Sequence, residues 1–317
     1  MTLEEAVHHF TQAEPRGRRK LVAVSGGRDS VALLCALHGA GHRNLVVCHL
    51  NHRLRGRQAA GDARFVRRLG EKLSLPVEVE SCDVKLAAGR DGESLELAGR
   101  KARRAFFLEC ARKYRCRTVV LAHHAGDQAE TLLFNLLRGA GGLRGIRQVS
   151  ILTGLPGRPL RLVRPLLDVS RQEIDAWLTA RGIAYREDAT NSELQPVRNR
   201  LRHQVIPLLN AVMQRDVGPQ LCRAWEITAA DEDWLEQLTG PMTLDGELDV
   251  VQLRDLPLGA QRRVIHVWLR NRGAAGVSFD AVERVRAMLE TARGPSGVTL
   301  VGGRLVRRSK GKLRAQW

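Results

Sequence analysis

The chain has 317 residues, of which 44% are hydrophobic and 27% are charged, a composition typical of globular proteins. This length is enough for two domains that need no disulfide or metal to fold. Its formal net charge of +17 indicates a polyanionic partner, although a coding bias toward arginine would give the same excess. No apolar run reaches the roughly 18 residues of a membrane span, and the first ten residues carry two acids, so we expect a cytosolic protein that makes no membrane contact. The six cysteines include no C-x-x-C pair, which predicts buried thiols and no zinc site.

Short β-branched runs alternate with amphipathic stretches through the first two thirds of the chain. This alternation predicts βαβ units and therefore an α/β fold with a doubly wound, mainly parallel, Rossmann-like sheet. The expected strands are Leu21–Ser25, Leu45–Asn51, Pro76–Cys82, Thr118–His123 and Leu160–Pro165. The expected helices are Asp29–Gly39, Ala59–Leu73, Ser94–Tyr114, Asp127–Arg138 and Ser170–Arg181.

The pattern changes near residue 210, which predicts a first domain over residues 1–212 and a smaller α+β or helical domain over 213–317. In the second domain we expect a helix containing two tryptophans, helices over Gly259–Arg272 and Asp280–Thr291, and a hairpin whose turn is Gly302-Gly303. Residues 231–250 hold seven acids and no base, whereas 304–314 hold six bases and no acid. Six glycines between Gly139 and Gly157 predict a mobile loop beside the functional site.

The first expected strand runs into a glycine turn and a helix start, with the sequence V-A-V-S-G-G-R-D-S over residues 22–30. The two glycines let the backbone approach phosphate oxygens, and the new helix directs free N–H groups and its positive dipole end at an anion. The turn matches neither of two common nucleotide-binding patterns, the P-loop G-x-x-x-x-G-K-[ST] and the dinucleotide-binding G-x-G-x-x-G. Because a carboxylate beside phosphates needs a cation, Asp29 indicates Mg²⁺. The alternative is a tight turn capped by serine and aspartate.

Polar residues also follow the later strands, at the edge where parallel sheets bind ligands. His49 and His52 end the second strand, and we expect them to face a ligand rather than the core. Arg100, Arg103 and Arg104 share one helix face, which is either a clamp for phosphate or RNA, or a solvated basic face.

Asp127 and Glu130 lie three apart in the first turn of a helix, directly after His123 and His124. Acids in a first turn complement the helix dipole, for about 0.3–1 kcal/mol each. Two carboxylates on one face beside a phosphate-binding loop are also suited to bind a cationic amine. The neighbouring phosphate loop favours this second interpretation.

These motifs stand in a fixed order over about residues 18–210: S-G-G-R-D-S, H-L-N-H-R-L-R-G, G-R-K-A-R-R-A-F-F, L-A-H-H-A-G-D-Q-A-E-T-L-L, R-P-L-L-D, and E-D-A-T-N-S followed by R-N-R-L-R. The loop is similar to that of the N-type ATP pyrophosphatases, or PP-loop enzymes, and the whole set resembles the tRNA(Ile)-lysidine synthetase family. Residues 211–317 resemble the family's tRNA-binding domain in order and size. The family usually reads H-H-x-D-D-Q where this chain has Gly126, and has a tyrosine where Arg104 stands.

The resemblance implies ligation of free L-lysine to C2 of the wobble cytidine of an isoleucine tRNA with a CAU anticodon. The cytidine would be adenylated by ATP with Mg²⁺, and pyrophosphate and AMP would leave. A homodimer is also suggested. The implied ATP site is Ser25, Gly26, Gly27, Arg28, Asp29, Ser30, His49 and His52, with Arg100 and Arg103 neutralising phosphate. Asp127 and Glu130 would bind lysine, His123 or His124 would take the amine proton or grip phosphate, and Arg198, Asn199 and Arg202 would meet ATP, lysine or tRNA.

Two other functions stay open on the residues alone. One is tRNA thiolation by a related PP-loop enzyme, which needs catalytic or cluster-binding cysteines, and the lack of C-x-x-C argues against it. The other is a basic RNA-binding module without catalytic activity.

Overall fold

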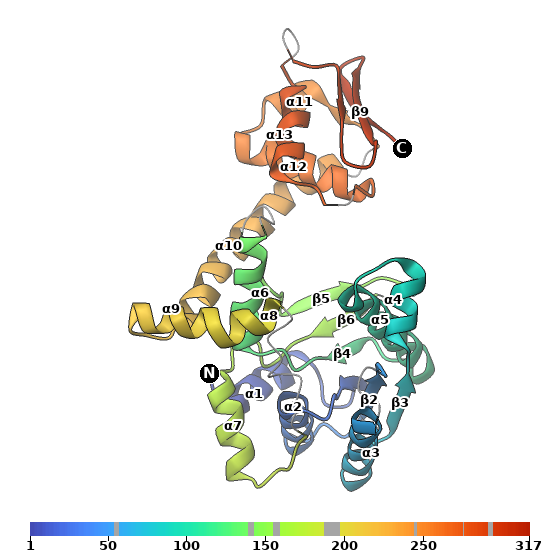
Figure 1. The fold of residues 1–317 in the computed structure, drawn as a ribbon, viewed down its shortest axis with the longest axis vertical. Coiled ribbons are helices and arrows are strands. Elements are labelled where there is room, and N and C mark those ends of the chain that lie inside the picture. Colours follow the sequence, from blue (N-terminus) through green and yellow to red (C-terminus); the bar gives the residue numbers. More distant parts are fainter. Residues whose placement is uncertain are drawn as a thin grey trace. The chain divides into compact units, whose positions relative to one another are not determined.

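The computed structural model describes residues 1–53, 57–138, 143–154, 159–186, 197–243, 246–274, 276–290 and 294–317. Internal contacts divide the chain into two compact units, drawn as ribbons in Figure 1. Unit 1 comprises Met1–Thr131 and Gly145–Pro219, and unit 2 comprises Leu132–Arg144 and Gln220–Trp317. Among the described helices, none has both the length and the apolar character needed to cross a membrane.

Unit 1 is built on a six-stranded sheet with the order β3-β2-β1-β4-β6-β5 (Figure 1). Neighbouring strands are parallel except for β5, which runs antiparallel to β6. The strands are β1 (Lys20–Ala23), β2 (Leu45–Asn51), β3 (Val77–Ser81), β4 (Thr118–Val120), β5 (Val149–Leu152) and β6 (Leu160–Val163). The chain moves outward from β1 to β3 and then returns to β4 on the other side of β1. This reversal makes the carboxyl ends of β1 and β4 the expected ligand edge.

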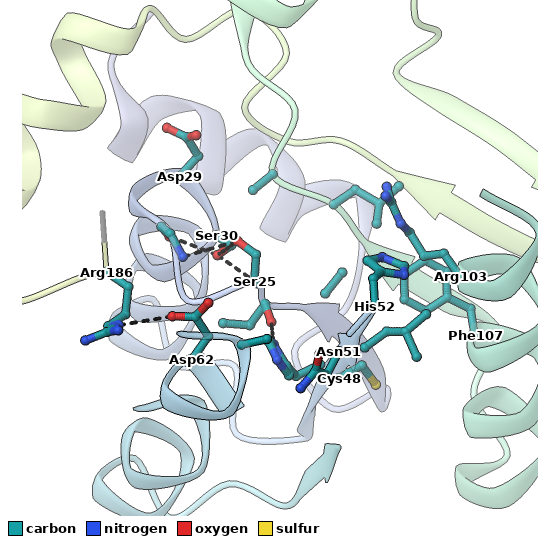
Figure 2. A pocket seen from close by; sticks show the side chains of 18 of the residues that line it. Ser25, Asp29, Ser30, Cys48, Asn51, His52, Asp62, Arg103, Phe107 and Arg186 are labelled. Atoms are coloured by element: carbon teal, nitrogen blue, oxygen red, sulfur yellow. Dashed lines mark hydrogen bonds and ion pairs between the residues drawn. The ribbon is translucent and has the colours of Figure 1, made fainter. Parts of the chain in front are cut away.

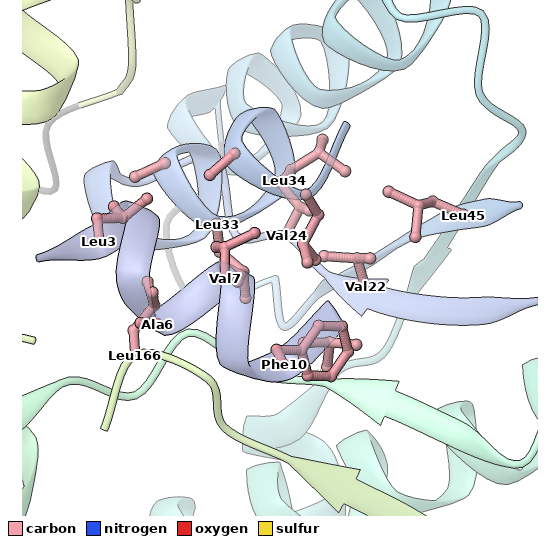
Figure 3. Packing of buried hydrophobic residues seen from close by; sticks show 14 of the residues in the cluster. Leu3, Ala6, Val7, Phe10, Val22, Val24, Leu33, Leu34, Leu45 and Leu166 are labelled. Carbon is pink, nitrogen blue, oxygen red and sulfur yellow. The ribbon is translucent and has the colours of Figure 1, made fainter. Parts of the chain in front are cut away.

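Helices cover both faces of the sheet, because successive strand residues point to opposite sides. Val22 belongs to the core cluster formed with α1, α2 and α7, part of which is drawn in Figure 3. Leu21 belongs to the opposite cluster, with Phe106 and Phe107 of α5. The helices are α1 (Leu3–Ala13), α2 (Arg28–Gly39), α3 (Arg57–Lys72), α4 (Val84–Asp91), α5 (Leu95–Tyr114), α6 (Ala125–Leu137), α7 (Arg171–Ala180), α8 (Val197–Arg200), the π-helical η2 (Leu201–Val205) and α9 (Ile206–Met213).

The predicted α/β fold is confirmed, and each of its five expected strands and five expected helices is present within a few residues of the expected bounds. The sequence patterns missed α1, α4 and the run from α8 to α9. They also missed β5, which lies inside the glycine-rich segment expected to be a mobile loop. Val149 of β5 pairs with Val163 of β6, so sheet pairing orders this part. Residues 139–142 and 155–158 of that segment lie outside the described residues.

Unit 2 has a four-stranded antiparallel sheet in the order β7-β10-β9-β8 and a core that includes the fully buried Trp268. The expected Gly302-Gly303 turn joins β8 to β9, and Lys310-Gly311, with φ of 50° and 73°, forms a second tight turn. The elements are α10 (Gly218–Thr239), η3 (Gly240–Thr243), β7 (Leu248–Asp249), α11 (Val250–Arg254), α12 (Leu258–Asn271), α13 (Phe279–Ala287), β8 (Gly297–Thr299), β9 (Leu305–Ser309) and β10 (Lys312–Gln316).

The acidic stretch is in part a structural feature of unit 2. Glu232 and Glu236 lie on α10, and their carboxylates are 3.6 and 3.7 Å from the guanidinium of Arg263 on α12. Glu247 pairs in the same way with Arg314, at 2.7 Å, on β10. The acids therefore compensate arginines of their own unit.

Lys20 is a fully buried lysine at the start of β1. Its Nζ donates to the carbonyl oxygens of Pro15, at 2.6 Å, and Arg18, at 3.0 Å, in the segment that joins α1 to β1. These bonds give the buried ammonium group the acceptors that it needs away from water. The lysine thereby fixes how the first helix leads into the central strand.

We expect Lys20→Met to lower the free energy of unfolding by about 2 kcal/mol, because two hydrogen bonds from a charged donor are lost while the methionine keeps the apolar packing. Urea unfolding followed by circular dichroism measures this loss. Lys85→Met on α4 is the matched control, since Lys85 is exposed. Equal stability of the two variants would contradict the structural role of Lys20.

Candidate active site

A cavity of about 390 Å³ opens at the carboxyl ends of β1, β2 and β4 (Figure 2). The switch in strand order lies at this edge, so the cavity is where the topology predicts a ligand. Of the residues that the sequence assigns to the ATP site, the ones that line the cavity are Ser25, Gly27, Asp29, Ser30, His49 and His52, and Arg103 and His123 line it too.

Hydrogen bonds to a serine hydroxyl within the loop after β1 hold its conformation. The backbone N–H of Ser25 donates to Ser30 Oγ at 3.1 Å, and that hydroxyl donates to the carbonyl of Gly27 at 2.9 Å. Gly26 has φ +95°, a conformation that favours glycine. Gly27 is the N-cap residue of α2 and provides no side-chain cap, so the first amides of the helix stay available to an anion. The glycine turn and the uncapped helix start that the sequence predicts are therefore present.

Arg186 holds this loop in place, and the sequence analysis missed it. Its backbone N–H donates to the carbonyl of Gly26 at 2.9 Å, and its guanidinium pairs with Asp62 of α3 at 3.0 Å (Figure 2). Arg186 directly precedes the E-D-A-T-N-S motif, and that adjacency was the available signal. The motif itself, residues 187–192, lies outside the described residues.

The histidines of the cavity are uncharged near neutral pH. Burial, together with the nearby Arg103, lowers the pKa of His52 to about 4. Burial also lowers the pKa of His123 to about 4, against an opposing effect of the Asp127 carboxylate. The Nδ1 atoms of both rings are buried and have no hydrogen-bond partner among the described residues. His49 differs, because its Nδ1 donates to the carbonyl of Val24 at 2.8 Å.

Asp29 connects the cavity to a second cluster of charged residues. Burial raises the pKa of its carboxyl group, with His124 acting in the opposite direction. Its Oδ1 is buried without a hydrogen-bond partner among the described residues, as suits a carboxylate that awaits a cation. No set of three His, Cys, Asp or Glu side chains in the described part of the chain could hold a metal. The implied Mg²⁺ thus fits only if phosphate and water supply its other ligands, which is usual for Mg²⁺.

His124 bridges the two clusters from a buried position. Its Nε2 lies 3.9 Å from Asp29 Oδ2 and 3.8 Å from Asp127 Oδ2. The backbone N–H of Gly126 donates to its Nδ1 at 3.0 Å, so the neutral ring carries its proton on Nε2, directed at the carboxylates. A β-carbon on Gly126 would lie 2.7 Å from Cε1 of this ring. The ring conformation therefore depends on the glycine that departs from the family pattern.

Asp127 and Glu130 of α6 do lie on one face, and Arg202 of η2 binds both of them. The guanidinium donates to Asp127 Oδ1 at 3.1 Å and, through Nε, to Glu130 Oε1. Burial raises the pKa of the Glu130 carboxyl group, while the arginine opposes this rise. The two carboxylates predicted to bind an amine therefore already have a cationic partner.

Three other predicted residues have their side chains outside the cavity. The guanidinium of Arg28 donates to Asp175 of α7 at 2.6 Å and lies over the ring of Tyr185, so it is engaged away from the phosphate loop.

Arg100 and Arg198 each lie 3.6 Å from the carboxylate of Glu96 at the start of α5. Arg100, Arg103 and Arg104 on the arginine face of α5 are all exposed, and of the three only Arg103 lines the cavity. Asn199 and Gly26 do not line the cavity either.

Comparison with known proteins gives a consistent result over both units. A family described as the PP-loop domain matches residues 1–209, and one described as the TilS substrate binding domain matches residues 248–314. A tRNA(Ile)-lysidine synthase of Geobacter sulfurreducens is 41% identical over 294 residues, which are 89% of this chain and 61% of that protein. A tRNA(Ile)-lysidine synthase of Thermosynechococcus vestitus is 36% identical over 305 residues, which are 92% of this chain and 85% of that protein.

A solved structure supports the fold alone. The U34-tRNA thiolase NcsA from Methanococcus maripaludis superposes with a TM-score of 0.55 at 12% sequence identity. The superposition covers 71% of this chain and 79% of the thiolase.

The low pKa values of His52 and His123 give a measurable pH dependence. We expect both rings to titrate near pH 4 in NMR spectra of the folded protein, assigned with His52→Gln and His123→Gln, and near pH 6.5 in urea. Because the unfolded chain binds these protons first, their contribution to the free energy of unfolding falls as pH drops from about 6.5 to 4. A midpoint near 6.5 in the folded protein would show that the rings are solvated.

Proposed function

The chain belongs to the tRNA(Ile)-lysidine synthase family, and on this basis we propose that it ligates free L-lysine to C2 of the wobble cytidine of isoleucine tRNA with a CAU anticodon. One observation carries the proposal: Asp29 and His124 link a phosphate-binding loop to the paired carboxylates Asp127 and Glu130. An ATP subsite and an amine subsite therefore adjoin. Family membership favours ligation over thiolation or RNA binding alone.

In the first step, the C2 oxygen of cytidine attacks the α-phosphate of ATP, and pyrophosphate leaves. Adenylation turns a poor leaving group into AMP, and catalysis rests on positioning and charge neutralisation. The uncapped amides of α2 and the hydroxyl of Ser25 would hold the pyrophosphate. Arg103 would add positive charge at the cavity, and Asp29 would hold Mg²⁺, which would supply further positive charge against the phosphates when bound.

In the second step, the side-chain amine of lysine displaces AMP from C2. A free amine has a pKa near 10.4, so it must lose a proton to attack. Of the two candidate bases, His123 has a neutral ring whose buried Nδ1 has no hydrogen-bond partner among the described residues, but a pKa lowered to about 4 makes this ring a weak base. His124 is disfavoured, because Gly126 donates to its Nδ1 and its Nε2 already carries a proton. Asp127 and Glu130 would bind the ammonium groups of lysine.

We further propose that unit 2 contacts the tRNA backbone, although fewer cations are free for this role than the sequence suggests. Within the basic end, Arg308 donates to the carbonyls of Met288, at 2.6 Å, and Glu290, at 3.0 Å. Arg304 donates to a backbone carbonyl, and Arg314 and Lys312 pair with Glu247. The exposed cations that remain are Arg307 and Lys310. A homodimer stays a prediction of the family resemblance.

The reaction is tested by mass analysis of nucleosides after the protein is incubated with CAU-anticodon tRNA, ATP and lysine. We expect a lysyl adduct on cytidine, with AMP and pyrophosphate released only when both tRNA and lysine are present. Asp29→Asn should lower the rate by about 10²-fold or more, as the loss of one electrostatic contact in a transition state does. Asp91→Asn on exposed α4 is the control and should leave the rate unchanged. ATP turnover without tRNA or lysine would refute the proposal.

The tRNA contact is tested with the double variant Arg307→Glu, Lys310→Glu. We expect weaker tRNA binding in filter or fluorescence assays, and a salt dependence that is less steep by about 0.9 for each lost phosphate contact. Lys85→Glu with Arg90→Glu makes the same change of charge on α4 of unit 1. Equal weakening by both pairs would point to overall charge rather than to a contact of β9 and its turn.

A further inference from the structure

Three of the four oxygens of the carboxylates assigned to lysine already accept hydrogen bonds within the protein. Asp127 Oδ2 accepts the backbone N–H of His124 at 3.1 Å, and its Oδ1 accepts Arg202 at 3.1 Å. Glu130 is nearly buried, with 9% of its side chain exposed, and its Oε1 accepts Arg202 Nε. The guanidinium thus bridges the two carboxylates, and an ammonium group bound between Asp127 Oδ1 and Glu130 Oε1 would have to replace it.

The pairing has a clear physical reason in the absence of lysine. A carboxylate as buried as Glu130 is costly to ionise without a cation, and Asp127 adds negative charge beside it. A guanidinium supplies several N–H donors at once and stays charged at any relevant pH. Arg202 thus meets the same electrostatic need that a bound lysine would meet.

Resting on the function proposed above, we propose that Arg202 is an internal competitor for the lysine site. Its guanidinium occupies the position of the lysine ammonium group and is displaced from Asp127 and Glu130 when lysine binds. The two cations exclude each other at this position, because each would bridge Asp127 and Glu130 through the same two oxygens, Asp127 Oδ1 and Glu130 Oε1. Competition of this kind lowers the apparent affinity for every amine by the fraction of time that the site is open. This reduction is the same for every amine, so discrimination among amines comes from their other contacts with the site.

The location of Arg202 suits a side chain that must move. It belongs to η2, a π-helical turn between α8 and α9, in which the N–H of Ile206 bonds to the carbonyl of Leu201. Such turns are often found at functional sites within helices. With 22% of its side chain exposed, Arg202 lies at the edge of the protein rather than in the core. The guanidinium can therefore reach solvent when it leaves the carboxylates.

The test uses 1,5-diaminopentane, which has two ammonium groups like lysine but no carboxylate, so that relief of competition is the effect measured. We expect calorimetry to show about tenfold tighter binding of the diamine to Arg202→Gln than to the unaltered protein, a gain of roughly 1.4 kcal/mol. Arg202→Lys keeps a cation at the position and should give a smaller gain. Arg200→Gln is the matched control, since Arg200 is exposed and its side chain bonds to Gln204 on the same helical run.

The outcomes separate this inference from the proposed function. A folded Arg202→Gln protein that binds the diamine no better than the unaltered protein, or more weakly, overturns the inference, because it gives Arg202 only a structural role. Urea unfolding establishes that the variant is folded, and if it is not, the Arg202→Lys result decides. Failure of the unaltered protein to bind lysine, or binding that survives Asp127→Asn, would instead overturn the assignment of the lysine site.

Discussion

Three carboxylates must stay close together at the carboxyl ends of the central strands, and the surrounding structure compensates their charge. Asp29 starts α2, while Asp127 and Glu130 start α6, and each helix is anchored by a strand that ends at the same edge. The compensation comes from the Nε2 proton of His124 and the guanidinium of Arg202. The strand order, the tautomer of one histidine and the π-helical turn all serve this electrostatic requirement.

The sheet, its helices and the phosphate loop were predictable because their signals are local. Alternating apolar runs identify strands and helices, and the glycine-serine turn has few other uses after a buried strand. The partners of the charged side chains were not predictable. Arg202 is 72 residues from Glu130, and no periodicity links Arg186 to Gly26. Short β5 was missed because its order comes from pairing with β6 and not from its own sequence.

The charge of the chain has a different use in each unit. In unit 1, Arg186 and Arg202 pair with acidic side chains beside the site, and Arg103 lines the cavity. In unit 2, several arginines stabilise the fold itself, as Arg308 does by bonding to carbonyls at the end of α13 and Arg263 does by facing two acids of α10. Net charge alone therefore overstates the cations available to an RNA, and the structure reduces the basic end to a small exposed set.

Gly126 and His124 are coupled in this chain. The backbone amide of the glycine fixes the histidine tautomer, and the space above the glycine is filled by the same ring, 2.7 Å from where a β-carbon would stand. The family pattern H-H-x-D-D-Q keeps the histidine and has an aspartate at position 126, so beside that aspartate the ring must take another rotamer. The residue at position 126 therefore decides where His124 lies relative to Asp29 and Asp127, although the histidine itself stays the same.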